Sequence, residues 1–404
     1  MTSSLTSSRL AEEERDRPFS RSQDETTDTT TQTDSARTNL KNLLPHELAA
    51  WFGAHGEKPF RARQLVKWLY QKYEQDFLRM TDLSGALRER LNTLAVIPGL
   101  DLVTHQRAVA GDTEKFLFRL PDGNTLETVL MHFDDHLGPG RATLCISTQV
   151  GCAMGCVFCA SGQSGVLRNL ETWEIVDQVL SVQRLIASRG ERIANVVYMG
   201  IGEPLANYTN TIRSVKILNH EEGLAIGMRH IAISTSGLVP AMLRLGLEKL
   251  PLRLAISLHA ANNELRSALM PVNKLYPLER LIAACHTYQQ QTGRRITFEY
   301  CCIRDINDSD ADAHAVGRLL EGVHALLNII PLNPVEGYNG QRPAPARVHA
   351  FQQIIESYGI KTTVRQTMGV DIAAACGQLR RNETQVIAGR TIARVGKVGL
   401  EKRS

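Results

Sequence analysis

Apolar residues recur every three or four positions between Asn39 and about Gly99. This is the spacing of one face of a helix, and it predicts a small helical module. The recurring positions are Leu43, Leu44, Leu48 and Trp51, then Gln64, Leu65, Trp68, Leu69 and Tyr73, and finally Leu83, Leu87 and Leu91. Cations lie between them at Lys58, Arg61, Arg63 and Lys67. From the pattern alone these charges indicate only a solvated helix face.

The pattern changes to that of strands after residue 101. Two runs of strand-forming residues, 115–120 and 125–130, flank the turn dipeptide Asp122-Gly123 and predict a β-hairpin. Beyond it, apolar runs at 143–147, 195–199, 230–234, 253–257, 296–300, 325–330 and 362–365 alternate with helical stretches that include 174–188, 278–290, 312–320 and 347–358. This alternation predicts an α/β fold, a partial TIM-like (β/α) barrel on a parallel sheet. Functional residues of such barrels gather at the carboxyl ends of the strands.

Composition divides the chain further. The first 38 residues hold sixteen Ser or Thr and thirteen charged residues and almost nothing apolar, so we expect a disordered tail. The resulting division is a tail at 1–38, a helical module at 39–100, a hairpin linker at 101–141, the barrel at 142–380 and a C-terminal extension at 381–404.

Charge and cysteine usage narrow the class of protein. The net charge is only +4, which permits a nucleic-acid partner without arguing for one. The sequence contains no run of eighteen apolar residues and no secretory leader, so we expect a cytoplasmic protein with no membrane partner. Its eight cysteines then need an explanation other than structural disulfides.

The strongest chemical signal is a Cys-x3-Cys-x2-Cys run, Cys152, Cys156 and Cys159, directly after the first barrel strand. Three thiolates this close can converge on one soft metal site. A zinc site would want a further ligand pair at the usual spacing, and Cys285, Cys301 and Cys302 are not so arranged, so we assign those three to structure. An iron–sulfur cluster of the [4Fe–4S] type takes four ligands, so three cysteines would leave one iron open.

This run resembles the signature of the radical S-adenosylmethionine superfamily, in which the open iron chelates the cofactor. Gly200-Ile201-Gly202-Glu203-Pro204 follows the strand at 195–199 and is similar to the superfamily's GGEP motif. The resemblance implies that Gly202 and Glu203 support the amine of S-adenosylmethionine. Taken alone, the glycines would indicate only a tight turn after a strand.

A narrower resemblance extends over roughly residues 40–380. The segments 59–64, 142–152 and 369–379 are similar to those of the RlmN/Cfr family of radical SAM RNA adenine methyltransferases. Two positions depart from the family pattern: Ala373 stands where many members have Asp, and Met368 where a basic residue is common. The segment 132–141 is longer than usual. The resemblance implies that the helical module binds RNA.

The family resemblance assigns roles to two further cysteines. Cys376 would accept a methyl group from one S-adenosylmethionine, and a second molecule would generate the radical that activates this methyl group for attack on the adenine carbon. The protein–RNA thioether would be resolved by Cys145 with formation of a Cys145–Cys376 disulfide. Glu127 would be the proton acceptor. The cofactor would contact Ser234, Ser257, Leu258, His259 and Asn333, which follow the ends of predicted strands.

The expected product is an adenine methylated at C2, in 23S rRNA and in tRNA next to the anticodon. A Cfr-type enzyme that methylates C8 shares the same cysteines, and the helical module and chain length favour the C2 type. A non-catalytic iron–sulfur RNA-binding or assembly factor is the alternative from another class, but it would need neither Cys145 nor Cys376. We further expect a monomer that takes electrons from a donor such as flavodoxin or ferredoxin.

Overall fold

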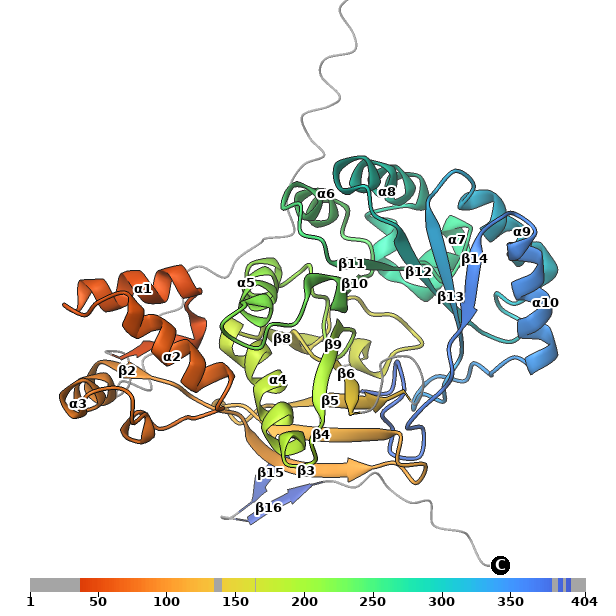
Figure 1. Cartoon of the computed structure of the whole chain (residues 1–404). Coiled ribbons are helices and arrows are strands. Elements are labelled where there is room, and N and C mark those ends of the chain that lie inside the picture. The colour runs from red at the N-terminus through yellow and green to blue at the C-terminus, as the bar shows by residue number, and fades with distance from the viewer. Residues whose placement is uncertain (1–36, 134–139, 164, 380–383, 388–389, 394–404) are drawn as a thin grey trace, which may run out of the picture.

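A ten-stranded sheet forms the centre of the protein in the computed structural model (Figure 1). The structure describes residues 37–133, 140–163 and 165–379 and the backbone of two strands at 384–387 and 390–393. The strand order is β14-β13-β12-β11-β10-β9-β6-β5-β4-β3. The part from β6 to β14 is parallel, whereas β3, β4, β5 and β6 pair antiparallel to one another. This confirms the predicted α/β class.

The strands of this sheet are β3 (Asp101–Arg107), β4 (Thr113–Arg119), β5 (Thr125–His132), β6 (Arg141–Cys145), β9 (Arg192–Tyr198), β10 (Ile231–Thr235), β11 (Arg253–Ser257), β12 (Ile296–Cys302), β13 (Ala325–Pro331) and β14 (Lys361–Val364). The short pairs are β1 (Thr38–Asn39) with β2 (Ala95–Val96), β7 (Gln149–Gly151) with β8 (Val166–Asn169), and β15 (Thr384–Ile387) with β16 (Arg390–Ala393). All seven predicted barrel strands are present, within three residues of the expected bounds.

The helices are α1 (Pro45–Ala54), α2 (Phe60–Tyr70), α3 (Gly85–Leu94), α4 (Thr172–Ala187), α5 (Tyr208–Asn219), α6 (Val239–Leu247), α7 (Asn263–Leu269), α8 (Leu278–Thr292), α9 (Asp310–Leu319) and α10 (Pro345–Glu356). The last seven lie around the curved parallel part of the sheet, which is the layering of a partial barrel (Figure 1). Short 3-10 turns occur at Leu40–Asn42, Phe77–Arg79, Ala160–Gly162, Met228–His230 and Pro271–Lys274.

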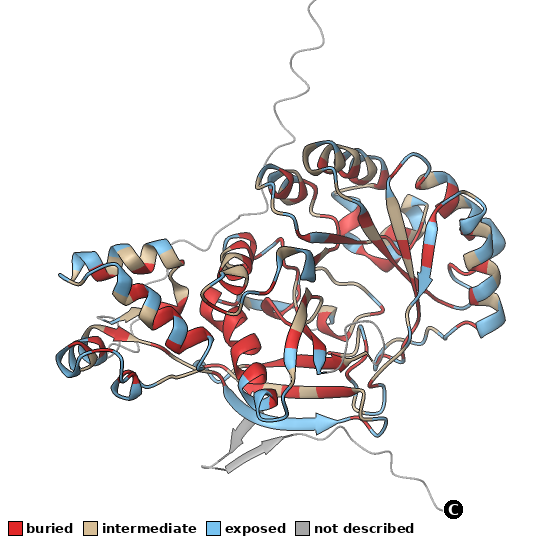
Figure 2. Cartoon of the chain, viewed as in Figure 1, coloured by how far each residue is buried: buried red, intermediate tan, exposed pale blue. Residues whose placement is uncertain are grey.

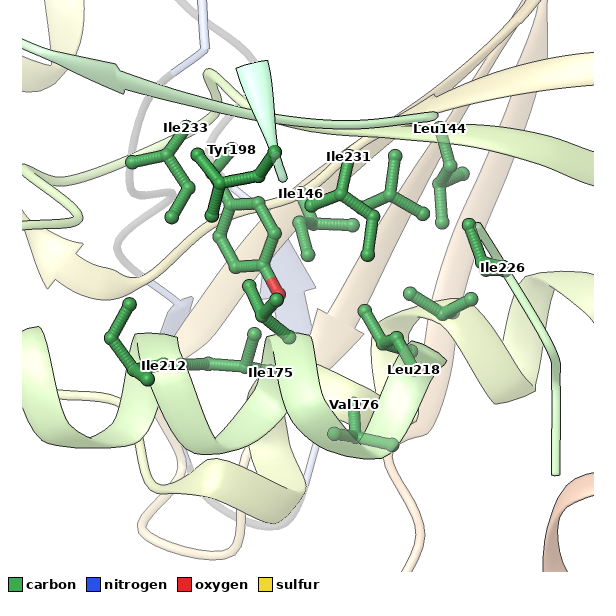
Figure 3. Packing of buried hydrophobic residues seen from close by; sticks show 14 of the residues in the cluster. Leu144, Ile146, Ile175, Val176, Tyr198, Ile212, Leu218, Ile226, Ile231 and Ile233 are labelled. Carbon is green, nitrogen blue, oxygen red and sulfur yellow. The ribbon is translucent and has the colours of Figure 1, made fainter. Parts of the chain in front are cut away.

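The main core lies between the first parallel strands and helices α4 and α5 (Figure 3). Ile231 and Ile233 alternate along β10, so both point to the same face of the sheet, where Ile175 of α4 and Ile212 of α5 meet them. Thirteen of the sixteen residues of α4 are buried. Figure 2 shows this helix as the most enclosed one, and β3 as an exposed edge strand. The exposure explains why β3 was missing from the predicted hairpin: its residues carry no apolar alternation.

Helices α1 to α3 pack around their own apolar residues, which include the predicted Leu48, Leu65, Leu69, Leu87 and Leu91. The module contacts the barrel through a buried ion pair, in which Lys41 Nζ lies 2.6 Å from Asp177 Oδ1 on α4. Asp177 Oδ2 accepts a hydrogen bond of 2.7 Å from the backbone of Leu100, and Lys41 Nζ donates to the Pro98 carbonyl at 2.6 Å. The predicted tail, up to residue 36, lies outside the described residues, as does most of the C-terminal extension.

Breaking this ion pair should destabilise the protein. Lys41→Met leaves the Asp177 carboxylate buried without its countercharge, so we expect the free energy of unfolding to fall by about 3–5 kcal/mol, measured by urea unfolding. The double variant Lys41→Met/Asp177→Asn should recover most of the loss. Lys216→Met, which breaks an exposed pair with Glu248, should cost about 1 kcal/mol or less. Equal losses in Lys41→Met and Lys216→Met would contradict this account.

Candidate active site

A large cavity lies at the carboxyl ends of the parallel strands. It encloses an empty volume of about 1240 Å³ that is open to solvent, and Cys145, Ser234 and Ser257 enter it from the ends of β6, β10 and β11. The predicted site residues that line it are Cys145, Cys152, Cys156, Cys159, Gly202, Glu203, Ser234, Ser257, His259, Asn333 and Cys376. Leu258 and Glu127 do not line it, because Leu258 belongs to the main core and Glu127 is buried beside the cavity.

The three clustered cysteines lie on a loop that glycines allow to turn sharply. A Cβ at Gly151 (φ +80°) would lie 2.0 Å from the Gly165 carbonyl oxygen, which accepts a hydrogen bond of 2.9 Å from the Cys152 N–H. Cys159 donates its backbone N–H to the Cys156 carbonyl at 3.2 Å. All three thiols are free and line one wall. Burial, together with their mutual charge, raises the pKa of Cys152 to about 12 and that of Cys156 further.

The arrangement of these thiols is explained better by a bound metal cluster than by packing in an apolar core. Without a cation, three neighbouring thiolates would repel one another, whereas a bound metal deprotonates the thiols that coordinate it and neutralises the charge. Soft thiolate ligands are those that iron–sulfur clusters use. The donor set at Cys152, Cys156 and Cys159 therefore fits a cluster held by three protein ligands.

The loop after β9 brings a carboxylate to the same wall. A Cβ at Gly202 (φ +107°) would lie 2.7 Å from Cβ of Gln149, so the close approach requires glycine here. Glu203 accepts hydrogen bonds from the backbone N–H groups of Ser236 at 2.7 Å and Leu205 at 3.0 Å. Burial raises the pKa of Glu203, and these donors oppose that rise. The fixed carboxylate is suited to receive a cationic amine.

His259, two residues after the end of β11, is held as a neutral hydrogen-bond acceptor. Its backbone adopts a positive φ of 59°, and its Nδ1 accepts the backbone N–H of Cys301 at 2.8 Å. Because Nδ1 accepts, the proton of the neutral ring sits on Nε2. Burial lowers the pKa of His259 to about 3, so the ring stays neutral at physiological pH. Phe158 of the cysteine loop contacts the ring edge to face, with centroids 4.8 Å apart.

Cys376 lies on a loop that is tied to the cysteine loop. The Ala160 N–H donates to the Gly377 carbonyl at 2.8 Å, and the Ser161 hydroxyl donates to the Leu379 carbonyl at 2.5 Å. Asn333 Nδ2 donates to the carbonyl of Cys376 itself at 3.0 Å. These bonds hold the exposed Cys376 thiol in the cavity that the three clustered cysteines share.

Cys145 is the last residue of β6 and lines the same cavity, although it is distant from Cys376 in the sequence. It is buried, and its register partner is Val129 of β5. Burial raises the pKa of Cys145 to about 12, the nearby Cys376 adds to the rise, and Arg365 opposes it. The two cysteines are thus close enough to interact electrostatically, and both are free thiols.

Glu127 lies two residues before Val129 on β5, so its side chain leaves the same face of the strand. It is buried and forms an ion pair with Lys115 Nζ on β4, with an N–O distance of 3.2 Å. Ser147 Oγ donates a hydrogen bond of 2.8 Å to its backbone carbonyl.

Sequence reasoning missed the charged residues Glu299 and Arg365 of the cavity wall, and Cys301, which it assigned to structure, also lines the cavity. Glu299 and Cys301 are on β12, and Arg365 directly follows β14. Asn328 Nδ2 donates to Glu299 Oε2 at 2.8 Å. The guanidinium of Arg365 favours the charged forms of both Cys145 and Cys376. The position of Arg365 directly after a strand was the available signal, whereas Glu299 lies in the middle of β12 and gave none. Cys285 and Cys302 are core residues as predicted.

Among the helices that the structure describes, none is long and apolar enough to cross a membrane. The family model for the N-terminal domain of ribosomal RNA large subunit methyltransferases matches residues 38–97, and the radical SAM superfamily model matches residues 146–315.

Full-length relatives agree with both matches. A protein of Desulforamulus reducens is 47% identical over 85% of this chain and 96% of its own length, and one of Moorella thermoacetica is 46% identical over 87% and 100%. Both bear the name "Probable dual-specificity RNA methyltransferase RlmN". The crystal structure of a radical SAM methyltransferase from Sphaerobacter thermophilus is 46% identical, with a TM-score of 0.81 over 85% of this chain and 99% of that one. The chain therefore belongs to the RlmN family of radical SAM RNA methyltransferases, a membership that implies a [4Fe–4S] cluster and S-adenosylmethionine.

Proposed function

We propose that this protein methylates C2 of an adenine in 23S rRNA and of the adenine next to the anticodon in tRNA. The observation that carries the proposal is the convergence on one cavity of five of the six free cysteines that line it, Cys145, Cys152, Cys156, Cys159 and Cys376. Three of them suit a cluster, and the other two suit methyl transfer and release. A non-catalytic iron–sulfur protein would have no use for the second pair.

The residues divide the site between two groups. The cluster would be held by Cys152, Cys156 and Cys159. S-adenosylmethionine would be surrounded by Glu203, Ser234, Ser257, His259 and Asn333. Gly202 leaves space for the cofactor, and Leu258 supports the cavity wall from the core. When bound, the cluster would supply the electron that cleaves a carbon–sulfur bond of the cofactor, which makes abstraction of a hydrogen atom possible. It would also accept one electron when the adduct forms. The first electron comes from a donor such as flavodoxin or ferredoxin.

Cys376 provides the first covalent step. Its thiolate attacks the methyl carbon of one S-adenosylmethionine; the bond between that carbon and the sulfonium breaks, and S-adenosylhomocysteine leaves with the electron pair. Burial raises the pKa of Cys376, and the positive charge of Arg365 opposes that rise and so supports this step. A second S-adenosylmethionine is consumed when a hydrogen atom is removed from the S-methyl group, and the carbon radical left on Cys376 bonds to C2 of adenine.

Cys145 and Glu127 complete the reaction. Glu127 accepts the proton from C2 of the adduct. The Cys145 thiolate then attacks Sγ of Cys376; the S–C bond to the base breaks, its electron pair stays on carbon, and protonation of that carbon gives the methyl group. The resulting disulfide must be reduced by an external thiol before the next turnover.

The helical module and the barrel form the two functional parts in this proposal, with bounds at 39–100 and 142–380 and the hairpin linker that carries Glu127 between them. Lys58, Arg63 and Lys67 are exposed on or beside α2, where they can contact phosphates. C2 rather than C8 is favoured because the match at residues 38–97 is to the N-terminal domain of ribosomal RNA large subunit methyltransferases. We propose a cytoplasmic monomer.

The clustered cysteines predict the metal content. Anaerobically reconstituted protein should hold one oxygen-sensitive [4Fe–4S] cluster, and Cys152→Ala, Cys156→Ala or Cys159→Ala should each abolish cleavage of S-adenosylmethionine, because each removes a cluster ligand. Iron and sulfide analysis with electron paramagnetic resonance checks this. Cys285→Ala, at a core cysteine on α8, is the control and should keep its iron. Stoichiometric zinc with full activity and no iron would refute the assignment.

The reactive pair predicts two different failures. Cys376→Ala should form no S-methylcysteine and leave RNA unmodified, because the methyl acceptor is gone. Cys145→Ala should still load the methyl group and add it to RNA, and should therefore accumulate a covalent protein–RNA adduct through Cys376. A denaturing gel, nuclease digestion and peptide mass spectrometry detect the adduct; Cys302→Ala, in the core, should turn over normally. Normal turnover by Cys145→Ala, or adenine methylation by Cys376→Ala, would rule out the thioether route.

The exposed cations predict the salt dependence of RNA binding. Replacing Lys58, Arg63 and Lys67 by Gln should weaken RNA binding and lower the slope of log affinity against log salt by up to about 2, because fewer counterions are released. The control replaces Lys249, Arg318 and Lys361, exposed cations remote from this module. Removal of residues 1–36 should leave catalysis unchanged. If the first triple variant and the control bind RNA alike, the module is not the RNA-binding part.

A further inference from the structure

A second lobe of the cavity extends beyond Cys376. It has an empty volume of about 420 Å³, which includes space open to solvent, and it shares seven lining residues with the main cavity, among them Cys376, Asn333 and Arg365. None of the three clustered cysteines lines it. Cys376 therefore stands at the boundary between a lobe that contains the cluster ligands and a lobe that does not.

The chemistry of Cys376 requires two such lobes. A methyl group carried on its sulfur has to meet the cofactor when the hydrogen atom is removed, and it has to meet the base when the new carbon–carbon bond forms. Two molecules cannot reach one methyl group from the same side, so they must approach Cys376 from different directions. The lobe with Cys152, Cys156 and Cys159 is the side of the cofactor, and the second lobe is left for the base.

The walls of the second lobe have the character of a base-binding site. Met131, Phe133 and Met368 supply apolar surface, and they pack against the same small cluster as Cys145. Flat bases bind to aromatic rings and to polarisable thioethers through their faces. Gln366 is exposed in the same wall, and a glutamine amide can pair with the edge of adenine.

Thr113 contributes an unused polar atom to this lobe. It is 1% exposed, and its Oγ1 is buried with no hydrogen-bond partner among the described residues. Thr113 begins β4 opposite Met131 of β5, and its methyl group lies against Gly369, where a Cβ would come within 2.7 Å of it. A buried hydroxyl without a partner is costly, which indicates that a bound molecule supplies one.

Two further polar side chains of this wall, Asn333 and Thr367, are already engaged. The Asn333 amide donates to the Cys376 carbonyl at 3.0 Å and accepts from the Thr367 hydroxyl at 3.3 Å. Thr367 in turn accepts a hydrogen bond of 2.9 Å from Arg342. These bonds fix the wall and leave the Thr113 hydroxyl as its buried unpaired group.

We propose that the second lobe binds the target adenine, turned out of the RNA strand, and that the Thr113 hydroxyl hydrogen-bonds to the edge of the base and determines base specificity. The inference rests on the proposed function and deepens it. An adenine offers an amino donor and ring-nitrogen acceptors, and a hydroxyl can pair with either kind. An enzyme that modifies a base carbon needs the base outside its stack, which is the arrangement this lobe provides.

The test pairs a protein change with a change in the base. Thr113→Val keeps the shape and removes the hydroxyl, and Thr113→Ser keeps the hydroxyl. Each is assayed with an anticodon stem–loop RNA whose target nucleoside is adenosine, purine riboside, 1-deazaadenosine, 3-deazaadenosine or 7-deazaadenosine. We expect Thr113→Val to lower kcat/KM for adenosine about tenfold, which is the loss expected for one buried hydrogen bond. The same variant should have little effect on the analogue that lacks the contacted group. Thr113→Ser should retain the wild-type discrimination.

Two measurements separate this inference from the function on which it rests. S-methylcysteine formation at Cys376 without RNA reports on the cofactor lobe alone, and Thr287→Val, on α8 outside both lobes, controls for the substitution. Fluorescence of an RNA with 2-aminopurine at the target position reports base capture even if no methyl group is transferred. Phe133→Ala should abolish the fluorescence change.

Equal losses of kcat/KM for all five nucleosides, or no loss, would overturn the role of Thr113. Absence of adenine methylation by the wild type with base capture intact would overturn the proposed function instead.

Discussion

The proposed reaction requires the sulfur of Cys376 to meet two partners, and the hydrogen bonds between the Cys376 loop and the cysteine loop hold it in a position that suits this requirement. The Ser161 hydroxyl and the Leu379 carbonyl are 218 residues apart in the chain, yet they bond at 2.5 Å. Together with the bond from Ala160 to Gly377, this fixes Cys376 against the loop that carries the three clustered cysteines. Gly377 takes a positive φ of 85°, and a Cβ there would lie 3.2 Å from the Phe158 carbonyl oxygen, so the close approach of the two loops favours glycine.

The barrel provides the rigid frame for this contact. Buried parallel strands end at one edge, and residues that directly follow them point into the same space without any sequence relation to one another. The helical module is joined to the frame by the buried pair of Lys41 and Asp177. Such a pair contributes little net stability compared with an apolar contact, but only one arrangement satisfies both charges. It therefore fixes the orientation of the module relative to the barrel, which the proposed RNA-binding role of the module requires.

Local signals were sufficient for part of the site and for most of the fold. The spacing of Cys152, Cys156 and Cys159, and their position after a strand, is readable because short-range spacing sets their proximity. The apolar runs of β9 to β14 are readable because both faces of those strands are covered. Arg365, Glu299 and Thr113 are different: Arg365 follows a strand, Glu299 lies in the middle of one and Thr113 begins one, and only the sheet brings these ordinary polar residues to the cavity. The same holds for β3, whose exposed residues carry no periodic signal.

The surroundings of the two reactive cysteines differ in a way that suits the order of the proposed steps. Cys145 is buried among Val129, Met131 and Ile201, and this burial raises its pKa to about 12. Cys376 is exposed in the cavity, where an incoming cofactor reaches it first. Burial raises the pKa of Cys376 as well, and Arg365 opposes the rise at both sulfurs. In the proposed reaction the buried Cys145 does not compete for the first methyl group and acts only on the thioether that Cys376 forms. The proposed division of roles between the two cysteines thus rests on their unequal exposure in the cavity.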